Sequence, residues 1–490
     1  MNIKNKKRKD EADLKSNALE RIKSLGIGWK QVVSVFSLFI LCMALFLKKS
    51  SFGGEFAGKL IVYTIAGVIA VFLCSRRITG RRLDEGEVSA LVIIMFLYFI
   101  IGYFVSEIRL YNGFFPNSIM LPSVIVVMLF SILIDARLAL TMAMVLPLCA
   151  FITGCVDVYG YIMAVFSALS GVIVIHGARR RMDLIIAGFV VAAVNAASVA
   201  SALFIARAPL SVYPPVLFWA AFNGVISGLL ILGILPLFEN ALHMATTFKL
   251  IEMLDTDAPL LRRLEQAAPG TYSHSMEVAK LAESACREIG ANALLARVGA
   301  YYHDIGKIDK ADYFVENQNI YNKHNMLNPR LSATVIRSHV KLGIEKARAM
   351  GLPNEVIEII ASHHGNSLIT WFYHSAVERE GDGNVNKEDF CYPGNPPHTK
   401  EAAVVMLADV TEAACRTLDK PTSGRLEKFI NDLIDKKIEA RQLSDSDLTF
   451  NNLEVIKKTF VRVLVAHYHA RIEYPNQEKQ VKDKDETKST

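Results

Sequence analysis

The chain has 490 residues, of which 52% are hydrophobic and 21% are charged, and its formal net charge at pH 7 is +6. Its length and the concentration of apolar residues before about residue 240 exclude a single soluble globular domain. The small positive charge lies mainly at the N-terminus and in short loops, which argues against a nucleic-acid polymer as partner. The seven cysteines show neither a CxxC motif nor regular spacing, so no disulfide framework is predicted.

The first half of the chain contains apolar segments of the length that crosses a membrane. A spanning helix needs roughly 20 mostly apolar residues. The sequence predicts about eight spans, one followed by seven, near residues 30–47, 57–74, 88–106, 118–134, 138–154, 158–177, 184–205 and 215–238. Ionisable side chains are rare inside these segments, which argues against a transporter.

Lysine and arginine in the loops predict the orientation of the spans. With the N-terminus inside, the inner loops carry most of the basic side chains, namely Arg76, Arg77, Arg81, Arg82, Arg137, Arg179, Arg180 and Arg181. An even number of spans also returns the chain to the cytoplasm. We therefore predict a multi-pass protein of the cell inner (cytoplasmic) membrane, with the N-terminus and the second half of the chain in the cytoplasm.

These patterns predict the following organisation of the chain. The segments are a basic cytoplasmic N-terminus (1–29), a first membrane anchor with a short outer loop (30–56), a seven-helix membrane domain (57–238), a helical connector (239–268), a soluble domain (269–476) and a disordered charged tail (477–490). The soluble domain shows helical periodicity and no alternating strand pattern, so the whole chain is predicted to be all-α. Pro269-Gly270 is predicted to break the chain, and the first helix of this domain begins after it and ends at about Ile289. Further helices are predicted at 294–305, 332–350, 353–362, 400–417, 423–441 and 451–472, with a loop at 380–399.

The soluble domain holds an ordered set of side chains that suit divalent transition metals. The candidate ligands are His274, His303, Asp304, His339, His363, His364 and Asp409. Each residue alone is an ordinary structural residue, but their joint occurrence on predicted helices favours a metal site. Five histidines and two aspartates are enough for two ions if one carboxylate bridges them.

Asp304 and Lys307 are the candidate catalytic residues. Neighbouring positions lie roughly 100° apart on a helix, so the helix of His303 and Asp304 would have to approach the metals side-on. Gly306 would let another backbone or a substrate come close, and Lys307 could reach a phosphate oxygen. Two divalent ions and two aspartates together have a net positive charge. This charge would lower the pKa of a bound water and would bind phosphate. The pattern therefore predicts a phosphoester hydrolase.

Several motifs carry a resemblance to a known family. They are His303-Asp304-Ile305-Gly306-Lys307 and the stretches 268–275, 295–304, 316–318, 392–394 and 406–409. With them the chain resembles the HD-domain metal-dependent phosphohydrolases in their HDIGK form. The resemblance extends to the seven-transmembrane HD family, whose studied members are cyclic di-AMP phosphodiesterases of the PgpH type, and it covers about residues 57–475.

The resemblance implies an activity and a division of the ligands between two ions. Cyclic di-AMP would be hydrolysed to linear pApA, with Lys307 assisting at the phosphate and with manganese or iron as the metal. One ion would be held by His274, His303, Asp304 and Asp409, and the other by His339, His363, His364 and the bridging Asp304. Family members usually carry a large extracellular domain after the first span, whereas here that interval is only about 48–56, so sensing by such a domain is not expected.

Two alternatives remain open at this point. The first is hydrolysis of cyclic di-GMP or another nucleotide, although the Gly-Tyr-Pro element of the HD-GYP enzymes is replaced here by Gly365-Asn366-Ser367. The second is a membrane receptor that binds a nucleotide without cleaving it, which the complete ligand set disfavours. The sequence is compatible with a homo-oligomer but does not predict one.

Overall fold

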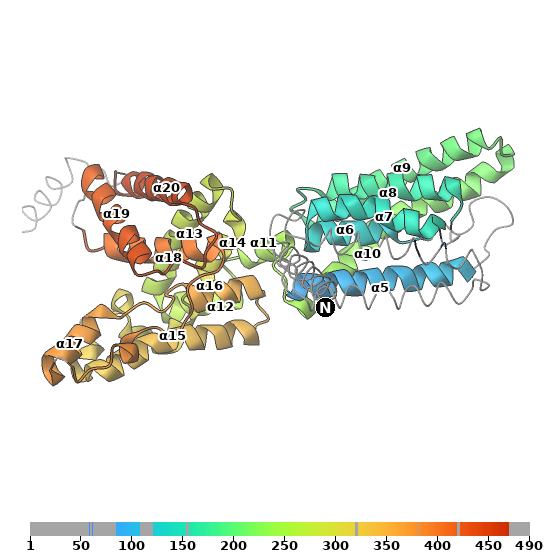
Figure 1. Cartoon of the computed structure of the whole chain (residues 1–490). Coiled ribbons are helices and arrows are strands. Elements are labelled where there is room, and N and C mark those ends of the chain that lie inside the picture. The colour runs from blue at the N-terminus through green and yellow to red at the C-terminus, as the bar shows by residue number, and fades with distance from the viewer. Residues whose placement is uncertain are drawn as a thin grey trace, which may run out of the picture. The chain divides into compact units, whose positions relative to one another are not determined.

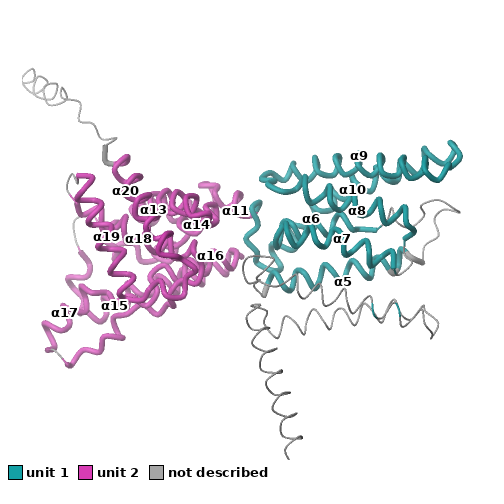
Figure 2. Tube along the Cα trace, turned by 45° about the horizontal axis from the view of Figure 1, so that its top comes forward, with its two compact units in different colours: residues 1–248 teal, residues 249–490 magenta. Residues whose placement is uncertain are grey.

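The computed structural model (Figure 1) describes residues 58, 61, 85–107, 121–152, 156–318, 322–381, 383–418 and 422–469. The predicted N-terminal segment 1–29, the spans at 30–47 and 57–74, the outer interval 48–56 and the tail 477–490 lie outside these residues, apart from Gly58 and Ile61. The chain divides into two compact units, residues 1–248 and 249–490 (Figure 2).

The described part of the first unit is built from apolar helices. These are α5 (Glu85–Glu107), α6 (Ser123–Leu133), α7 (Ala136–Ile152), α8 (Val158–Ile175), α9 (Arg181–Ile205) and α10 (Tyr213–Leu242). Each coincides with one of the six predicted spans that fall in this part of the chain. By length and composition, three helical segments there could cross a membrane: Val158–Ile175, Arg181–Ile205 and Leu210–Leu242. The predicted count of eight spans therefore stays a prediction.

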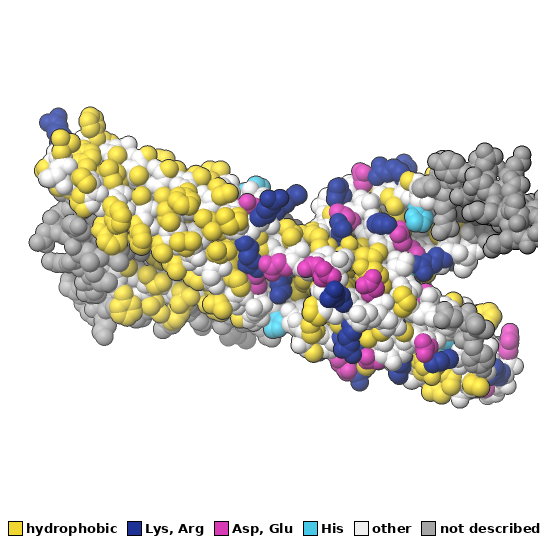
Figure 3. Space-filling view, turned by 180° about the vertical axis from the view of Figure 1, so that it is seen from behind, with side chains coloured by type: hydrophobic (Ala, Val, Ile, Leu, Met, Phe, Trp, Pro, Cys, Tyr) yellow, Lys and Arg dark blue, Asp and Glu magenta, His cyan; other side chains and the backbone are white. Residues whose placement is uncertain are grey.

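Small residues allow the longest of these helices to pack closely. α9 and α10 lie side by side, and a Cβ atom at Gly224 would lie only 2.3 Å from the backbone nitrogen of Ala192. Such small-residue contacts are typical of helix pairs in a lipid environment. Large apolar side chains also cover the outer surface of this unit (Figure 3), and Phe204 is 80% exposed. Both features fit a unit surrounded by hydrocarbon.

The predicted connector 239–268 consists of three helical pieces. α10 continues to Leu242, and the chain then turns at His243, whose φ of 51° lies in the left-handed region. Two short helices follow, α11 (Thr247–Met253) and α12 (Pro259–Ala267). The buried carboxylate of Glu239 holds this turn, because it accepts hydrogen bonds from Arg181 and Thr246.

The second unit is all-helical in its described residues, as predicted. After α12, its α-helices are α13 (Pro269–Glu288), α14 (Ala293–Tyr302), α15 (Pro329–Ala349), α16 (Asn354–Ser362), α17 (Thr370–Glu380), α18 (Lys400–Cys415), α19 (Ser423–Glu439) and α20 (Phe450–His469). Four short 3₁₀ segments join them, namely η3 (Ile305–Tyr313), η4 (Val315–Asn317), η5 (Lys323–Met326) and η6 (Lys387–Phe390). The described residues contain no β-strand, only an isolated bridge between Leu368 and Cys391.

The centre of this unit is formed by α18 and its neighbours. α13 packs against α14, α18 and α20, and residues 402–409 of α18 are all buried. Because Asp409 ends that buried run, its carboxylate is held inside the protein. The apolar sequence of α18 therefore places a charged group at the middle of the helical assembly.

Several helix boundaries differ from the prediction. α13 begins at Pro269, where a break was expected, because proline at the first helical position lacks only an N–H that has no partner within the helix. The predicted helix 294–305 ends at Tyr302 and continues as the 3₁₀ segment η3. α17 was not predicted, and the predicted loop 380–399 is irregular except for η6.

Candidate metal centre

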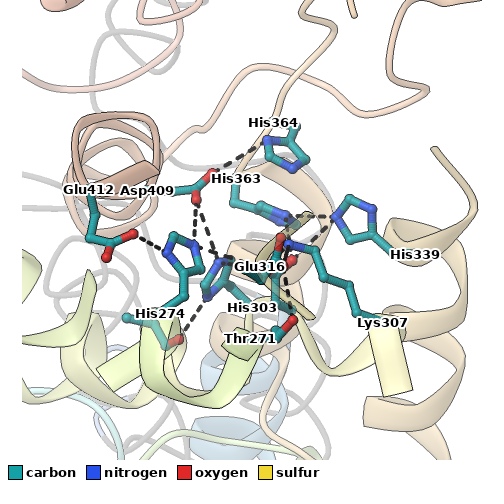
Figure 4. Close-up of polar contacts among 12 residues, drawn as sticks. Thr271, His274, His303, Lys307, Glu316, His339, His363, His364, Asp409 and Glu412 are labelled. Atoms are coloured by element: carbon teal, nitrogen blue, oxygen red, sulfur yellow. Dashed lines mark hydrogen bonds and ion pairs between the residues drawn. The ribbon is translucent and has the colours of Figure 1, made fainter. Parts of the chain in front are cut away.

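The second unit brings all seven predicted ligands together (Figure 4). His274 comes from α13, His339 from α15 and Asp409 from α18. His303 and Asp304 were predicted inside the helix 294–305, which was wrong, whereas the helix predicted before His363 and His364 does end at Ser362. They lie just beyond the last residues of α14 and α16, where the backbone leaves the helix and its side chains can turn toward a common centre.

Asp304 lies between two groups of imidazole rings. Its Oδ2 atom is 3.2 Å from His303 Nε2 and 3.9 Å from His274 Nε2. Its Oδ1 atom is 3.4 Å from His339 Nε2 and 3.7 Å from His363 Nε2. The carboxylate thus presents one oxygen to each group, which is the arrangement that a bridging ligand requires.

Asp409 completes the centre on the side of His274. Its Oδ1 atom accepts a hydrogen bond from His274 Nε2 at 2.9 Å and lies 3.8 Å from His303 Nε2. Its Oδ2 atom lies 3.5 Å from His364 Nδ1. Two sets of side chains could each hold a metal ion, because the donor atoms within each set lie within 4.8 Å of one another. The first set is His274, His303 and Asp304, and the second is His339, His363 and His364.

Hydrogen bonds fix the rings of three ligands. The Nδ1 atoms of His303, His339 and His363 lie 2.7, 2.6 and 2.8 Å from the backbone oxygen three residues earlier in the chain. A proton on Nδ1 donates to that oxygen and leaves the lone pair of Nε2 free to bind a metal. In each case the local helical geometry sets the tautomer.

Unpaired buried atoms show that the centre fits divalent ions. His303 Nε2 and Asp304 Oδ1 are buried and have no hydrogen-bond partner among the described residues, which is costly unless another group satisfies them. Burial lowers the pKa of His339 and His364, and that of His363 to about 3. These rings are therefore neutral at physiological pH, which is the form that binds a metal.

Lys307 lies beside the centre and is paired with two carboxylates. Its Nζ atom is 2.6 Å from Asp304 Oδ2 and 2.8 Å from Glu316 Oε1. Burial would lower the pKa of Lys307, but the two negative charges outweigh burial and raise it. Burial would likewise raise the pKa of Asp304, yet its interactions with the neighbouring His303 and Lys307 side chains hold it well below its usual range. Both side chains are charged.

The structure adds two contacts that sequence reasoning missed. Glu412 pairs with Nδ1 of His274 and with Arg416, and so orients that ring. Its spacing from Asp409, three residues along the same buried helix, could have indicated a shared face. Tyr392 stacks on His364 with ring centroids 4.2 Å apart. In the sequence, Tyr392 stood out only as part of the motif 392–394.

Gly306 brings α15 to the centre, as its position predicted. A Cβ atom there would lie 1.8 Å from the backbone oxygen of His339 and 2.6 Å from the backbone nitrogen of Gly343. Only glycine allows such an approach. The contact holds His339 against the turn that carries Asp304.

Comparison with known families divides the chain as the structure does. Residues 55–246 match the family described as "7TM receptor with intracellular HD hydrolase". Residues 271–414 match the HD domain family, and this range contains all seven candidate ligands. HD domains are metal-dependent, which agrees with the donor set found here.

Similar proteins include two named cyclic-di-AMP phosphodiesterase PgpH. The one from Bacillus subtilis is 39% identical over 363 residues, which are 72% of this chain and 51% of that protein. The one from Listeria monocytogenes is 32% identical over 433 residues, which are 86% of this chain and 59% of that protein. Two crystal structures of the HD domain of L. monocytogenes PgpH, one of them in complex with cyclic di-AMP, are also similar. The sequence identity is 40%, the match covers 44% of this chain and all of that domain, and the TM-score is 0.42.

Proposed function

The chain belongs to the family of seven-transmembrane receptors with an intracellular HD hydrolase domain, and we propose that it is a membrane-bound phosphodiesterase that hydrolyses cyclic di-AMP to linear pApA. The observation that carries the proposal is the position of Asp304, whose two oxygens face different groups of histidines. The chain spans only 51% and 59% of the lengths of the two relatives named for this activity. The activity of the whole protein is therefore a proposal.

We assign the seven ligands to two divalent ions that share Asp304. His274, His303 and Asp409 would hold one ion, and His339, His363 and His364 the other, with manganese or iron suited to this mixture of nitrogen and oxygen donors. When bound, the ions supply positive charge that lowers the pKa of water and stabilises negative charge on phosphate.

Other side chains prepare the site for a phosphodiester. The buried carboxylate of Glu412 keeps His274 oriented, and the backbone oxygens three residues back keep His303, His339 and His363 oriented. Lys307 holds a positive charge against Asp304, and we assign it to stabilise the charge that develops on the reacting phosphate. We place this domain in the cytoplasm, at the inner face of the cell membrane, where a soluble dinucleotide can reach it.

The test uses the full chain, purified in detergent and supplied with manganese. It is incubated separately with cyclic di-AMP, cyclic di-GMP and bis(p-nitrophenyl) phosphate, and the products are separated by chromatography. We expect pApA from cyclic di-AMP and slower turnover of cyclic di-GMP. Faster turnover of cyclic di-GMP would overturn the substrate assignment. Tight binding of cyclic di-AMP without hydrolysis of any compound would favour the non-catalytic receptor.

A further inference from the structure

A second lysine, Lys437, lies near the centre and pairs with no carboxylate of the described residues. Lys437 is half-buried in the last turns of α19, and its Nζ atom donates to Ser367 Oγ at 2.8 Å. Among the residues that the structure describes, no carboxylate lies within ion-pair distance of this ammonium group. An ammonium group in this position attracts an anion, because its charge is removed from bulk water and is not neutralised.

Ser367 connects this lysine to the metal centre. It follows His364 by three residues, and its backbone oxygen accepts a hydrogen bond from the Tyr392 N–H at 3.0 Å. Tyr392 in turn stacks on the ring of His364. The charge of Asp409 also acts on Lys437. Lys437 and Ser367 therefore lie on the side of the centre formed by His364 and Tyr392.

The segment that carries Ser367 is held by contacts with the buried side chain of Gln442. Gly365 has a φ of 55°, and a Cβ atom there would lie 2.3 Å from Gln442 Oε1. Gln442, which is buried, also donates from Nε2 to Asn366 Oδ1 at 2.6 Å. The Gln442 side chain thus supports the turn between His364 and Ser367, where the Ser367 hydroxyl accepts from the Lys437 ammonium group.

The two lysines near the centre differ in their charge balance. Lys307 is paired with Asp304 and Glu316, so its charge is compensated within the protein. Within the described part of the chain, Lys437 has only the neutral Ser367 hydroxyl as hydrogen-bond partner. A cyclic dinucleotide carries two phosphodiesters, and only one of them can occupy the metal centre during a single cleavage. The other phosphodiester keeps its negative charge and needs a cationic partner.

We propose that Lys437 and Ser367 form a subsite for the phosphate that does not react. The inference rests on the proposed function, because it assumes a substrate with two phosphates. In this role Lys437 donates a charge-assisted hydrogen bond to the second phosphodiester, and Ser367 orients the ammonium group. The subsite favours cyclic dinucleotides over phosphodiesters that carry one phosphate.

The test compares Lys437→Gln with Lys436→Gln in the full chain in detergent with manganese. Lys436 is the neighbouring exposed lysine of α19 and serves as the matched control. Loss of a hydrogen bond to a charged group predicts that Lys437→Gln raises the KM for cyclic di-AMP by roughly 10- to 100-fold, with a much smaller change in kcat. The KM for bis(p-nitrophenyl) phosphate, which has one phosphate, should change by far less. Lys437→Arg should recover most of the affinity.

Three results would overturn the subsite. They are an unchanged KM for cyclic di-AMP in Lys437→Gln, an equal rise in KM for both substrates, and the same effect from Lys436→Gln. Should Lys437→Gln fail to fold, Ser367→Ala provides a second variant, with a smaller rise in KM that is again confined to cyclic di-AMP.

The proposed function and the subsite can fail separately. If the wild-type chain cleaves bis(p-nitrophenyl) phosphate but not cyclic di-AMP, the proposed function is wrong. The subsite is then tested by inhibition of that cleavage with cyclic di-AMP and cyclic di-GMP. A weaker inhibition of Lys437→Gln than of the wild type supports it, and equal inhibition, or none of the wild type, overturns it.

Discussion

Glu412 acts on the metal centre through His274. Its carboxylate accepts the Nδ1 proton of that ring, while Asp409 faces Nε2 at 2.9 Å. Removing the negative charge in Glu412→Gln should lower metal affinity and turnover by about 10- to 100-fold, the usual effect of a partner that orients a ligand. Metal titration followed by calorimetry measures the affinity. Glu427→Gln, at an exposed position of α19, is the control. Equal affinities in the two variants would contradict this role.

The protonation of His274 makes metal binding depend on pH. Burial lowers the pKa of His274, but hydrogen bonds from the ring to Asp409 and Glu412 outweigh burial and raise it to about 9. Below that pH the metal-free ring carries a proton that an ion must displace. Apparent affinity on this side should therefore rise with pH, by about tenfold per unit for one proton, until the pKa is passed.

Calorimetry in two buffers with different ionisation enthalpies counts the protons released on binding. His363 provides the internal contrast, because its pKa of about 3 leaves no proton to displace at neutral pH. We expect release of one proton by the ion that His274 binds. A metal affinity that stays constant between about pH 6 and pH 8 would contradict this assignment.

At the residue scale, the sequence predicted the candidate ligands better than the groups around them. Histidine and aspartate in a fixed order already indicate a metal site, and the structure brings all seven residues together. Glu412 was missed because its spacing from Asp409 indicates at most a shared helix face and does not reveal that His274 packs against that face. Its role comes from the packing of α13 on α18, which joins positions 138 residues apart.

Gly306 shows how one element depends on the lack of a side chain. A methyl group there would overlap the backbone of α15 at His339, so Gly306→Ala should push this helix away from Asp304. Overpacking of this kind costs about 1–3 kcal/mol of unfolding free energy. Thermal unfolding followed by circular dichroism measures the loss, and metal content should fall with it.

Gly424→Ala is the matched control for this substitution. Gly424 lies in α19, and a Cβ atom there would meet nothing within 4 Å. Alanine should therefore leave the unit as stable or more stable, by roughly 0.5–1 kcal/mol. An unfolding temperature of Gly306→Ala as high as that of Gly424→Ala would show that α15 does not need the close contact.

At the element scale, apolar periodicity predicted most helices but not where they end. The residues after Asp304 still have a helical pattern, yet they form 3₁₀ turns, beginning with the bond from Lys307 N–H to Asp304 O at 3.0 Å. α17 was missed because Ala376 is its only fully buried residue, so it has hardly any apolar stripe to recognise. Both features depend on tertiary contacts that a local pattern does not contain.

At the scale of the whole molecule, composition predicted a membrane part and a helical soluble part. The described residues confirm apolar helices in six of the predicted spans. The number that cross a membrane is harder to predict, because α6 has only 11 residues and α7 has 17. Apolar character follows from composition, whereas helix length also depends on turns such as the one between these two helices, where Asp135 Oδ1 accepts from Arg137 N–H at 2.7 Å.

Removal of metal should loosen the second unit as a whole. Its ligands extend from His274 to Asp409 and come from several separate elements, so ions that bind them join these elements together. A ligand at one hundred times its Kd adds about 2.7 kcal/mol to stability. Treatment with a chelator should therefore lower the unfolding temperature, and manganese should restore it. An unfolding temperature that does not respond to either would contradict metal binding.

The same spread of ligands links the supply of metal to the amount of protein in a cell. A chain starved of ions samples partly opened states more often, and proteases cut such states. Scarcity of the metal would then lower the amount of protein as well as its activity. Recovery of the activity would require synthesis of new protein. Limitation of the metal would therefore shorten the lifetime of the protein.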